Sequence, residues 1–387
     1  MAEPHIYFVA AEPSGDLLAR ETIEAIQRQT SAIRFSAIGG EELASLGLVS
    51  PIDITPLSIV GLFEGVRVYG TVLKLVEAAV EDIIAADPDM VVLVDSWGFM
   101  IRIAERLKER APHIKRFKLI GPQIWATRAG RAKKLAAAVD ELVCIHAMEE
   151  PYYEPFGLPT TVMGPPALSR TEQGDGAAFR AQLGISSDTP LLLVLPGSRP
   201  SEIQRTAPAL VEAARRVKHS VAGTHVVFAP APSVRAAFDE RFPDVEQWGS
   251  VAPEAASRYD IMAAADFALA CSGTVTSELA VQGTPFLVGY KTGVMTWAVA
   301  RYFLYKPNHI TLVNIAADDT EIAPEFIQFD LKPELIAERA IALLRDPDAR
   351  QKQVDAQNVA LTRMGKADAP APDIAARAIL ASISADK

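Results

Sequence analysis

The segment Leu191–Ile203, LLLVLPGSRPSEI, decides the predicted fold. An apolar run typical of a buried strand leads into Gly-Ser-Arg, and Pro200 suits the first turn of a helix. Arg199 falls at the N-cap, where arginine caps poorly, and Ser198 and Glu202 are four residues apart rather than the three of a capping box. We therefore expect the N–H groups at this helix start to lack an internal partner and, with Arg199, to bind an anion such as a diphosphate.

The same change from strand to helix recurs along the 387-residue chain, which is long enough for two domains. Such alternation is typical of parallel sheets covered on both faces. We predict an α/β protein with two Rossmann-like, doubly wound domains, 1–168 and 169–368, that face a central cleft, and a helix within 369–387 that packs back on the first. The expected strands are Ile6–Ala11, Phe35–Ile38, Met90–Val94, Phe117–Ile120, Glu141–Ile145, Thr161–Met163, Leu191–Leu195, His225–Ala229, Phe267–Ala270, Phe286–Gly289 and Ile310–Val313.

Composition excludes several classes of function. A net charge of -10 argues against general nucleic-acid binding, and no apolar run is long enough to span a bilayer, so we expect a cytoplasmic protein. The two cysteines, Cys144 and Cys271, have no CxxC spacing, so neither a zinc site nor a disulfide framework is expected. Residues 99–137 hold eleven Lys or Arg against two acids, which indicates either a solvated helix surface or a site for anionic lipid or phosphate.

Two strand ends of the first half carry candidate residues. After the first strand, Ser14 is the expected N-cap of a helix and Asp16 suits its first turn, in an ordinary capped turn or in a site. Asp95 ends the run Met90–Val94 beside Trp97. Partial desolvation of this carboxylate would suit it to act as a general base.

A further strand end lies in the second half, at Ser272-Gly273-Thr274, before another short helix. Its N–H groups are a second candidate anion site. Glu278, on that helix, either accepts hydrogen bonds from sugar hydroxyls or is a solvated surface residue.

Taken together, these stretches resemble the lipid-A-disaccharide synthase family, which are inverting glycosyltransferases of the GT-B architecture. The matching stretches are Ala11–Asp16, Leu57–Glu64, Pro88-Asp89 with Asp95, Ile124–Arg128 with Arg131, Leu195–Arg199 with Glu202, Ser272–Thr274 with Ser277–Leu279, Val288–Tyr290, and Asn314 with Pro324–Gln328. They occur in order over most of the chain, and their combination is specific although each motif alone is not.

The resemblance implies that the enzyme joins two acylated glucosamines, one carried by UDP and the other a 1-phosphate. It implies that the first domain binds the acceptor, with Asp95, Ser14 and Asp16 as catalytic residues. The second domain would bind the UDP of the donor through these residues: Arg199, Glu202, Ser272, Gly273, Thr274, Glu278 and Asn314. No metal or cofactor is implied, because UDP-sugar is a substrate.

The resemblance also implies work at the cytoplasmic surface of the inner membrane, without nucleic acid, and a homodimer is one expected assembly. Trp125, Arg128 and Arg131 would lie near the acceptor or the membrane. Val66 and Tyr69 belong to an apolar stripe, Leu62 to Val76, that is either core or an interfacial face, and residues 296–306 are a second interfacial candidate.

Four positions depart from the family pattern, at Gly98, Thr127, Pro165 and Asp318. The last lies in Asp-Asp-Thr where the family has Gly-Arg, and that reversal of charge would weaken donor binding. Two alternatives therefore stay open. One is another UDP-sugar enzyme of the GT-B architecture, and the other is a catalytically weakened paralogue that binds lipid or nucleotide-sugar.

Overall fold

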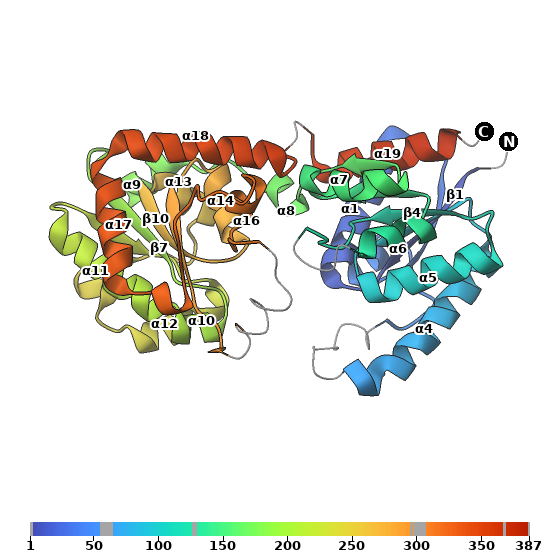
Figure 1. Ribbon diagram of the computed structural model, residues 1–387, viewed down its shortest axis with the longest axis horizontal. Helices are drawn as coiled ribbons and strands as arrows, with labels where there is room; N and C mark the ends of the chain where they lie inside the picture. The colour runs from blue at the N-terminus through green and yellow to red at the C-terminus, as the bar shows by residue number, and fades with distance from the viewer. Residues whose placement is uncertain are drawn as a thin grey trace. The chain divides into compact units, whose positions relative to one another are not determined.

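The chain folds into two compact units, Met1–Ser169 with Ala367–Lys387, and Arg170–Lys366, each with its own parallel sheet (Figure 1). The computed structural model describes residues 3–54, 65–125, 130–294, 297, 307–366 and 369–385, with the backbone alone at 65–69 and 385. The α/β fold with two doubly wound sheets is thus confirmed. Among these residues, none of the helices is both long and apolar enough to cross a membrane.

The first unit contains a six-stranded parallel sheet in the order β2-β1-β3-β4-β5-β6. Its strands are β1 (His5–Ala10), β2 (Arg34–Ile38), β3 (Met90–Val94), β4 (Lys115–Leu119), β5 (Glu141–Cys144) and β6 (Thr160–Val162). Its helices are α1 (Pro13–Gln29), α2 (Glu41–Ser45), α4 (Gly65–Ala86), α5 (Trp97–Arg110), α6 (Arg131–Ala138), α7 (Glu150–Tyr153), α8 (Pro166–Ser169) and α19 (Ala371–Ala385).

Alternation along β1 builds the core on both faces of this sheet. Tyr7 and Val9 point to one side, where α4, α5 and α6 pack, and Ile6 and Phe8 point to the other, where α1 and α19 pack (Figure 1). Because the sheet is covered on both faces, its central strands β1 and β3 are buried along their whole length. Val76, the last member of the stripe that begins at Leu62, is fully buried in this core, so an interfacial role for it is wrong.

The second unit repeats the architecture, with strand order β12-β11-β10-β7-β8-β9. Its strands are β7 (Leu191–Leu195), β8 (His225–Phe228), β9 (Ser250–Val251), β10 (Phe267–Cys271), β11 (Phe286–Tyr290) and β12 (Glu325–Ile327). Its helices are α9 (Gly176–Gln182), α10 (Pro200–Arg205), α11 (Ala207–Ser220), α12 (Arg235–Arg241), α13 (Arg258–Ala264), α14 (Val275–Val281), α16 (Leu312–Ala316), α17 (Pro333–Arg345) and α18 (Pro347–Arg363).

One expected strand is wrong. Ile310–Val313 does not pair with the sheet; Thr311 is instead the N-cap of helix α16. A short apolar run has no periodicity that separates a strand from a buried helical turn. The two edge strands of this sheet, β12 and β9, were not predicted; β12 pairs with β11 and β9 with β8, both in parallel.

The order of strands reverses once in each sheet. In the first unit the reversal lies between β1 and β3, and in the second between β7 and β10. Ligands of open α/β sheets bind beyond the carboxyl ends of the strands at such a switch point. Each unit therefore has one place where its fold favours a site.

Candidate functional site

At the switch point of the first unit, the start of α1 lies against the end of β3. A Cβ atom added to Gly15 would be 3.5 Å from Val94 Cγ1 and 3.8 Å from Asp95 Cβ. These are ordinary van der Waals distances, so the first turn of α1 lies directly beside the half-buried Asp95. The candidate base and the candidate helix start are therefore neighbours.

Asp95 has an uncommon backbone conformation. Its φ is +48° and that of Ser96 is +37°, in the left-handed region that residues other than glycine rarely adopt. The Asp95 N–H donates to the Leu119 carbonyl at 2.8 Å, and its carbonyl accepts a hydrogen bond from Lys118 Nζ at 2.5 Å. Both backbone groups of Asp95 are therefore tied to the end of β4.

Ser14 is not the N-cap that was expected, whereas Asp16 lies in the first turn of α1 as expected. Glu12, not Ser14, occupies the N-cap of α1, because Pro13 takes the first helical position, and Ser14 is exposed. Asp16 is buried, and its carboxylate accepts the N–H groups of Gly40 and Glu42, both at 2.8 Å. Asp16 thus holds the start of α2, and the structure gives it a positioning role.

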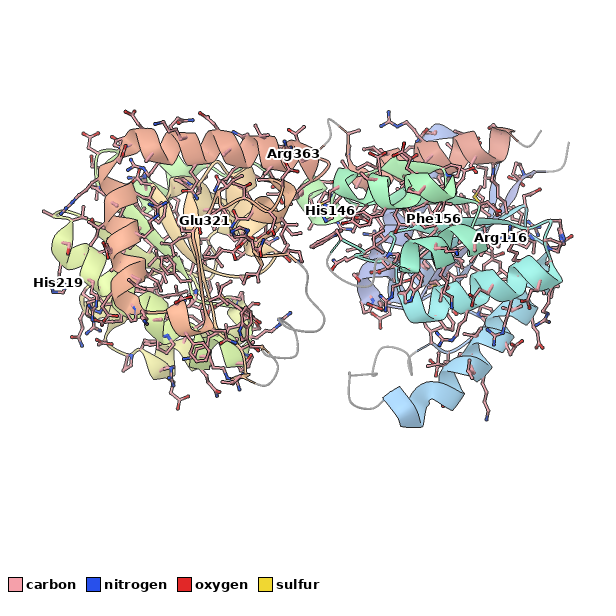
Figure 2. All side chains as sticks on the ribbon, viewed as in Figure 1. Arg116, His146, Phe156, His219, Glu321 and Arg363 are labelled. Carbon is pink, nitrogen blue, oxygen red and sulfur yellow. The ribbon has the colours of Figure 1, made fainter. Side chains whose placement is uncertain are left out.

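The aromatic and basic residues expected near the acceptor are partly described. The Arg131 guanidinium lies over the Trp97 ring, 5.1 Å from its centroid. Trp97 is two residues after Asp95 in the sequence. Trp125 makes an edge contact with the buried His146, which is labelled in Figure 2. The predictions for Arg128, for the side chains of Val66 and Tyr69, and for nearly all of 296–306 lie outside the described residues.

Much of the basic run at 99–137 is neutralised by acids from elsewhere in the fold. Arg106 and Arg110 both pair with Glu77 of α4. Further ion pairs join Arg116 to Asp140, Lys115 to Glu141 and Lys134 to Glu105; Arg116 is labelled in Figure 2. Three of these four acids are outside the run, which is why the local count of charges suggested a larger excess. These ion pairs indicate that the five cations stabilise the fold and do not form a site for anionic lipid or phosphate.

In the second unit, Arg199 is the N-cap of α10 as predicted and lies at the switch point, but the helix start is not without a partner. Glu202 Oε2 accepts the N–H groups of Ser198 at 2.8 Å and Arg199 at 3.2 Å. The expectation of unpartnered N–H groups here is wrong, because Glu202 is three residues after the N-cap Arg199, and the spacing from Ser198 was not the relevant one. The Arg199 side chain is 74% exposed, with Glu202 Oε1 3.6 Å away.

Gly197 makes this arrangement sterically feasible. Its φ is +133°, and a Cβ atom there would be 2.6 Å from Glu202 Cβ. Glycine is therefore required for the buried carboxylate to fold back under the loop.

The strand next to β7 brings the second candidate loop to the same edge. Ala270 pairs with Leu195 in the sheet, so Ser272–Thr274 and Arg199 follow adjacent strand ends. Burial raises the pKa of the Cys271 thiol to about 12, and the charges of Glu202 and Arg199 act on it in opposite directions. The two loops thus share one local electrostatic environment.

Glu278 is buried on α14 and not a solvated surface residue. Burial raises its pKa, while an ion pair with Arg258 at 2.9 Å opposes that shift. Arg258 also lies over the Tyr259 ring, at 4.8 Å from the centroid. A buried carboxylate with an exposed arginine beside it can accept hydrogen bonds from sugar hydroxyls.

Asn314 is fully buried, and its amide is saturated by its own chain. Nδ2 donates to the Ala323 carbonyl and Glu325 Oε1, and Oδ1 accepts the N–H groups of Ile322 and Ala323. These four bonds use the whole capacity of an asparagine side chain. The structure thus gives Asn314 a positioning role for the loop before β12, not a direct contact with nucleotide.

The loop that departs from the family pattern is also held internally. Asp318 pairs with Arg363 at 2.6 Å, and Asp319 accepts hydrogen bonds from the backbone and side chains of Asn308 and His309. Both aspartates have φ of +57°. The extra acids thus make contacts within the second unit, and their effect on donor binding stays a prediction.

Two residues at the switch points were not singled out from the sequence. Lys118 lies in the basic strand Lys-Arg-Phe-Lys-Leu, between the apolar residues Phe117 and Leu119, and its place in a strand was a usable signal. Arg258 lies 20 residues before Glu278 and had no local signal.

Comparisons with known proteins agree on family and fold. A family model described as lipid-A-disaccharide synthetase matches residues 6–379. A lipid-A-disaccharide synthase from Paramagnetospirillum magneticum is 36% identical over 365 residues, covering 93% of each chain. MurG of Acinetobacter baumannii has a TM-score of 0.60 at 15% identity, covering 98% of this chain and 99% of its own. S. aureus MnaA, solved with UDP, has a TM-score of 0.58 at 12% identity over 98% and 96%.

Proposed function

The chain belongs to the lipid-A-disaccharide synthase family, and from that membership we propose how its residues carry out the reaction. It is a hexosyltransferase that moves 2,3-diacylglucosamine from UDP to the 6-hydroxyl of 2,3-diacylglucosamine 1-phosphate, which gives the β-1,6-linked disaccharide and UDP. One observation carries the residue assignment. The family match spans both switch points, and each switch point presents a group with the charge that the reaction needs.

The second unit would hold the donor. The exposed Arg199 guanidinium would bind the diphosphate and stabilise the negative charge that grows on UDP as its bond to the anomeric carbon breaks. The N–H groups of Ser272, Gly273 and Thr274 would assist, and Glu278 would accept the ribose hydroxyls. Glu202 shapes the loop. Because Arg199 supplies the positive charge, the proposed reaction is independent of metal.

The first unit would hold the acceptor and the base. Asp95 would accept the proton of the 6-hydroxyl as that oxygen attacks the anomeric carbon from the face opposite UDP, with inversion. Arg131, which lies over Trp97, would bind the acceptor phosphate. Ser14, exposed in the first turn of α1, would contact substrate, whereas Asp16 acts through the loop that it holds.

We further propose that the enzyme acts as a peripheral protein at the cytoplasmic surface of the inner membrane, because both substrates carry acyl chains. Free UDP is soluble in water, but the acylated sugars partition into a bilayer. Assembly as a homodimer stays a prediction.

The test is a transfer assay with purified protein, both diacylated substrates in vesicles, and EDTA. We expect UDP and a diacylated disaccharide phosphate in equal amounts. UDP released only from a UDP-sugar without acyl chains would instead support another UDP-sugar enzyme. UDP binding without any transfer would support a weakened paralogue.

A further inference from the structure

We propose that Lys118 is a positioning residue for transfer, and that its buried ammonium fixes the backbone turn that presents Asp95 to the acceptor. This inference rests on the proposed role of Asp95 as the base. Lys118 lies on β4, beside β3, and the sheet register pairs it with Leu93. Its side chain is 1% exposed.

The hydrogen bonds of Lys118 all reach the strand ends around Asp95. Nζ donates to the carbonyl oxygens of Asp95 at 2.5 Å, Leu93 at 3.1 Å and Leu119 at 3.4 Å. An ammonium group has three donors, so the charged form satisfies all three carbonyls and a neutral amine does not. Protonated Lys118 thus holds both sides of the left-handed turn, since Leu119 also accepts the Asp95 N–H.

Two acids face this ammonium, from different elements. They are Asp95, after β3, and Glu12, the N-cap of α1. Burial lowers the pKa of Lys118 to about 7, and these two carboxylates oppose the shift. Deprotonation of Lys118 near neutral pH therefore removes one donor from the turn and one positive charge beside the candidate base.

Activity and stability then respond to pH in opposite directions. The ordinary lysine pKa of 10.5 applies to the unfolded chain, so between about pH 7 and 10 the unfolded chain binds more protons than the folded one. The contribution of Lys118 to the free energy of unfolding therefore rises with pH over this range. A rate that falls over the same range is not explained by loss of stability on deprotonation of Lys118.

The experiment compares Lys118→Met, which keeps chain length without charge, with wild type between pH 6 and 9. We expect kcat at pH 6 to fall roughly tenfold to a hundredfold, as for a misplaced catalytic group, with KM for both substrates within about twofold. The wild-type rate should fall toward that of the variant as pH rises through about 7, and the rate of the variant should lack this fall. Lys115→Met, on the same strand but bonded to Ser382 and Glu141, is the matched control and should keep wild-type kcat.

The Asp95→Asn variant tests the proposed base separately from the positioning role of Lys118. If that variant keeps full turnover, the proposed base is wrong. If it loses turnover while Lys118→Met keeps wild-type kcat and pH profile, the base stands and the inference about Lys118 is overturned. Should Lys118→Met fail to fold by circular dichroism, the wild-type profile decides, because a rate that is constant from pH 6 to 9 contradicts the inference.

Discussion

The two switch points are built with opposite charges. In the first unit a buried cation, Lys118, binds the carbonyl of Asp95, whose carboxylate is half-buried. In the second a buried anion, Glu202, binds the N–H groups of Ser198 and Arg199, whose guanidinium is exposed. In each unit the buried charge is opposite to that of the side chain the loop presents.

The difference shows how the backbone selects the buried partner. A turn that directs a carbonyl inward needs a donor, and a loop that directs N–H groups inward needs an acceptor. The side chain that each loop presents then carries the charge that its proposed role requires, which is proton acceptance for Asp95 and diphosphate binding for Arg199. Each of the following variants removes either the presented charge or the buried charge of one unit.

The largest effect is expected for Asp95→Asn, which removes the presented charge of the first unit. Turnover should fall by roughly two to four decades, the usual range for lost general-base catalysis. UDP affinity should stay nearly constant, because the proposed UDP contacts belong to the second unit. Steady-state UDP release and calorimetry measure the two quantities. Glu109→Gln, an exposed acid on α5, is the control, and equal turnover in Asp95→Asn would remove the residue from the mechanism.

Arg199→Ala removes the presented charge of the second unit. A hydrogen bond to a charged group contributes about 1.5–3 kcal/mol, so UDP should bind roughly ten to a hundred times more weakly by calorimetry. Arg216→Ala, whose guanidinium pairs with Glu212 and Glu334, should bind UDP as wild type does. Unchanged UDP affinity in Arg199→Ala contradicts the diphosphate role.

Glu202→Ala removes the buried charge of the second unit and leaves two backbone N–H groups without their acceptor. An unsatisfied group costs about 1–3 kcal/mol when it is buried; Ser198 and Arg199 are exposed, so solvation of their N–H groups should keep the total near the lower end of that range. Denaturant unfolding should show this loss, with UDP affinity lowered less than in Arg199→Ala. Glu212→Ala, on the surface of α11, is the control. A stability equal to wild type would mean that Glu202 does not shape the loop.

The contrast also shows what sequence predicts well. Apolar runs such as Met90–Val94 and Leu191–Leu195 gave strands at the predicted places, and the polar residues after them reached the switch points. Family, enzyme class and fold are confirmed. Ile310–Val313 was mispredicted because a four-residue apolar run suits a buried helical turn equally well.

The buried partners were harder to predict. Glu202 acts over three residues, so its capping was within reach of local spacing once the N-cap was placed at Arg199. Lys118 acts over 23 residues, and only the register of β3 with β4 brings it under Asp95. Asn314 likewise satisfies groups from 322 to 325, which no local pattern reveals.

The C-terminal helix sets the order in which the molecule is completed during translation. α1 leaves the ribosome early, yet the residues that cover its apolar face, among them Ala375, Ala376 and Ile379, are made only after all of Arg170–Lys366. The later unit is continuous and closes its core first. The apolar face of α1 that α19 covers therefore stays exposed to solvent until residues 371–385 have been synthesised, and it can bind chaperones during that interval.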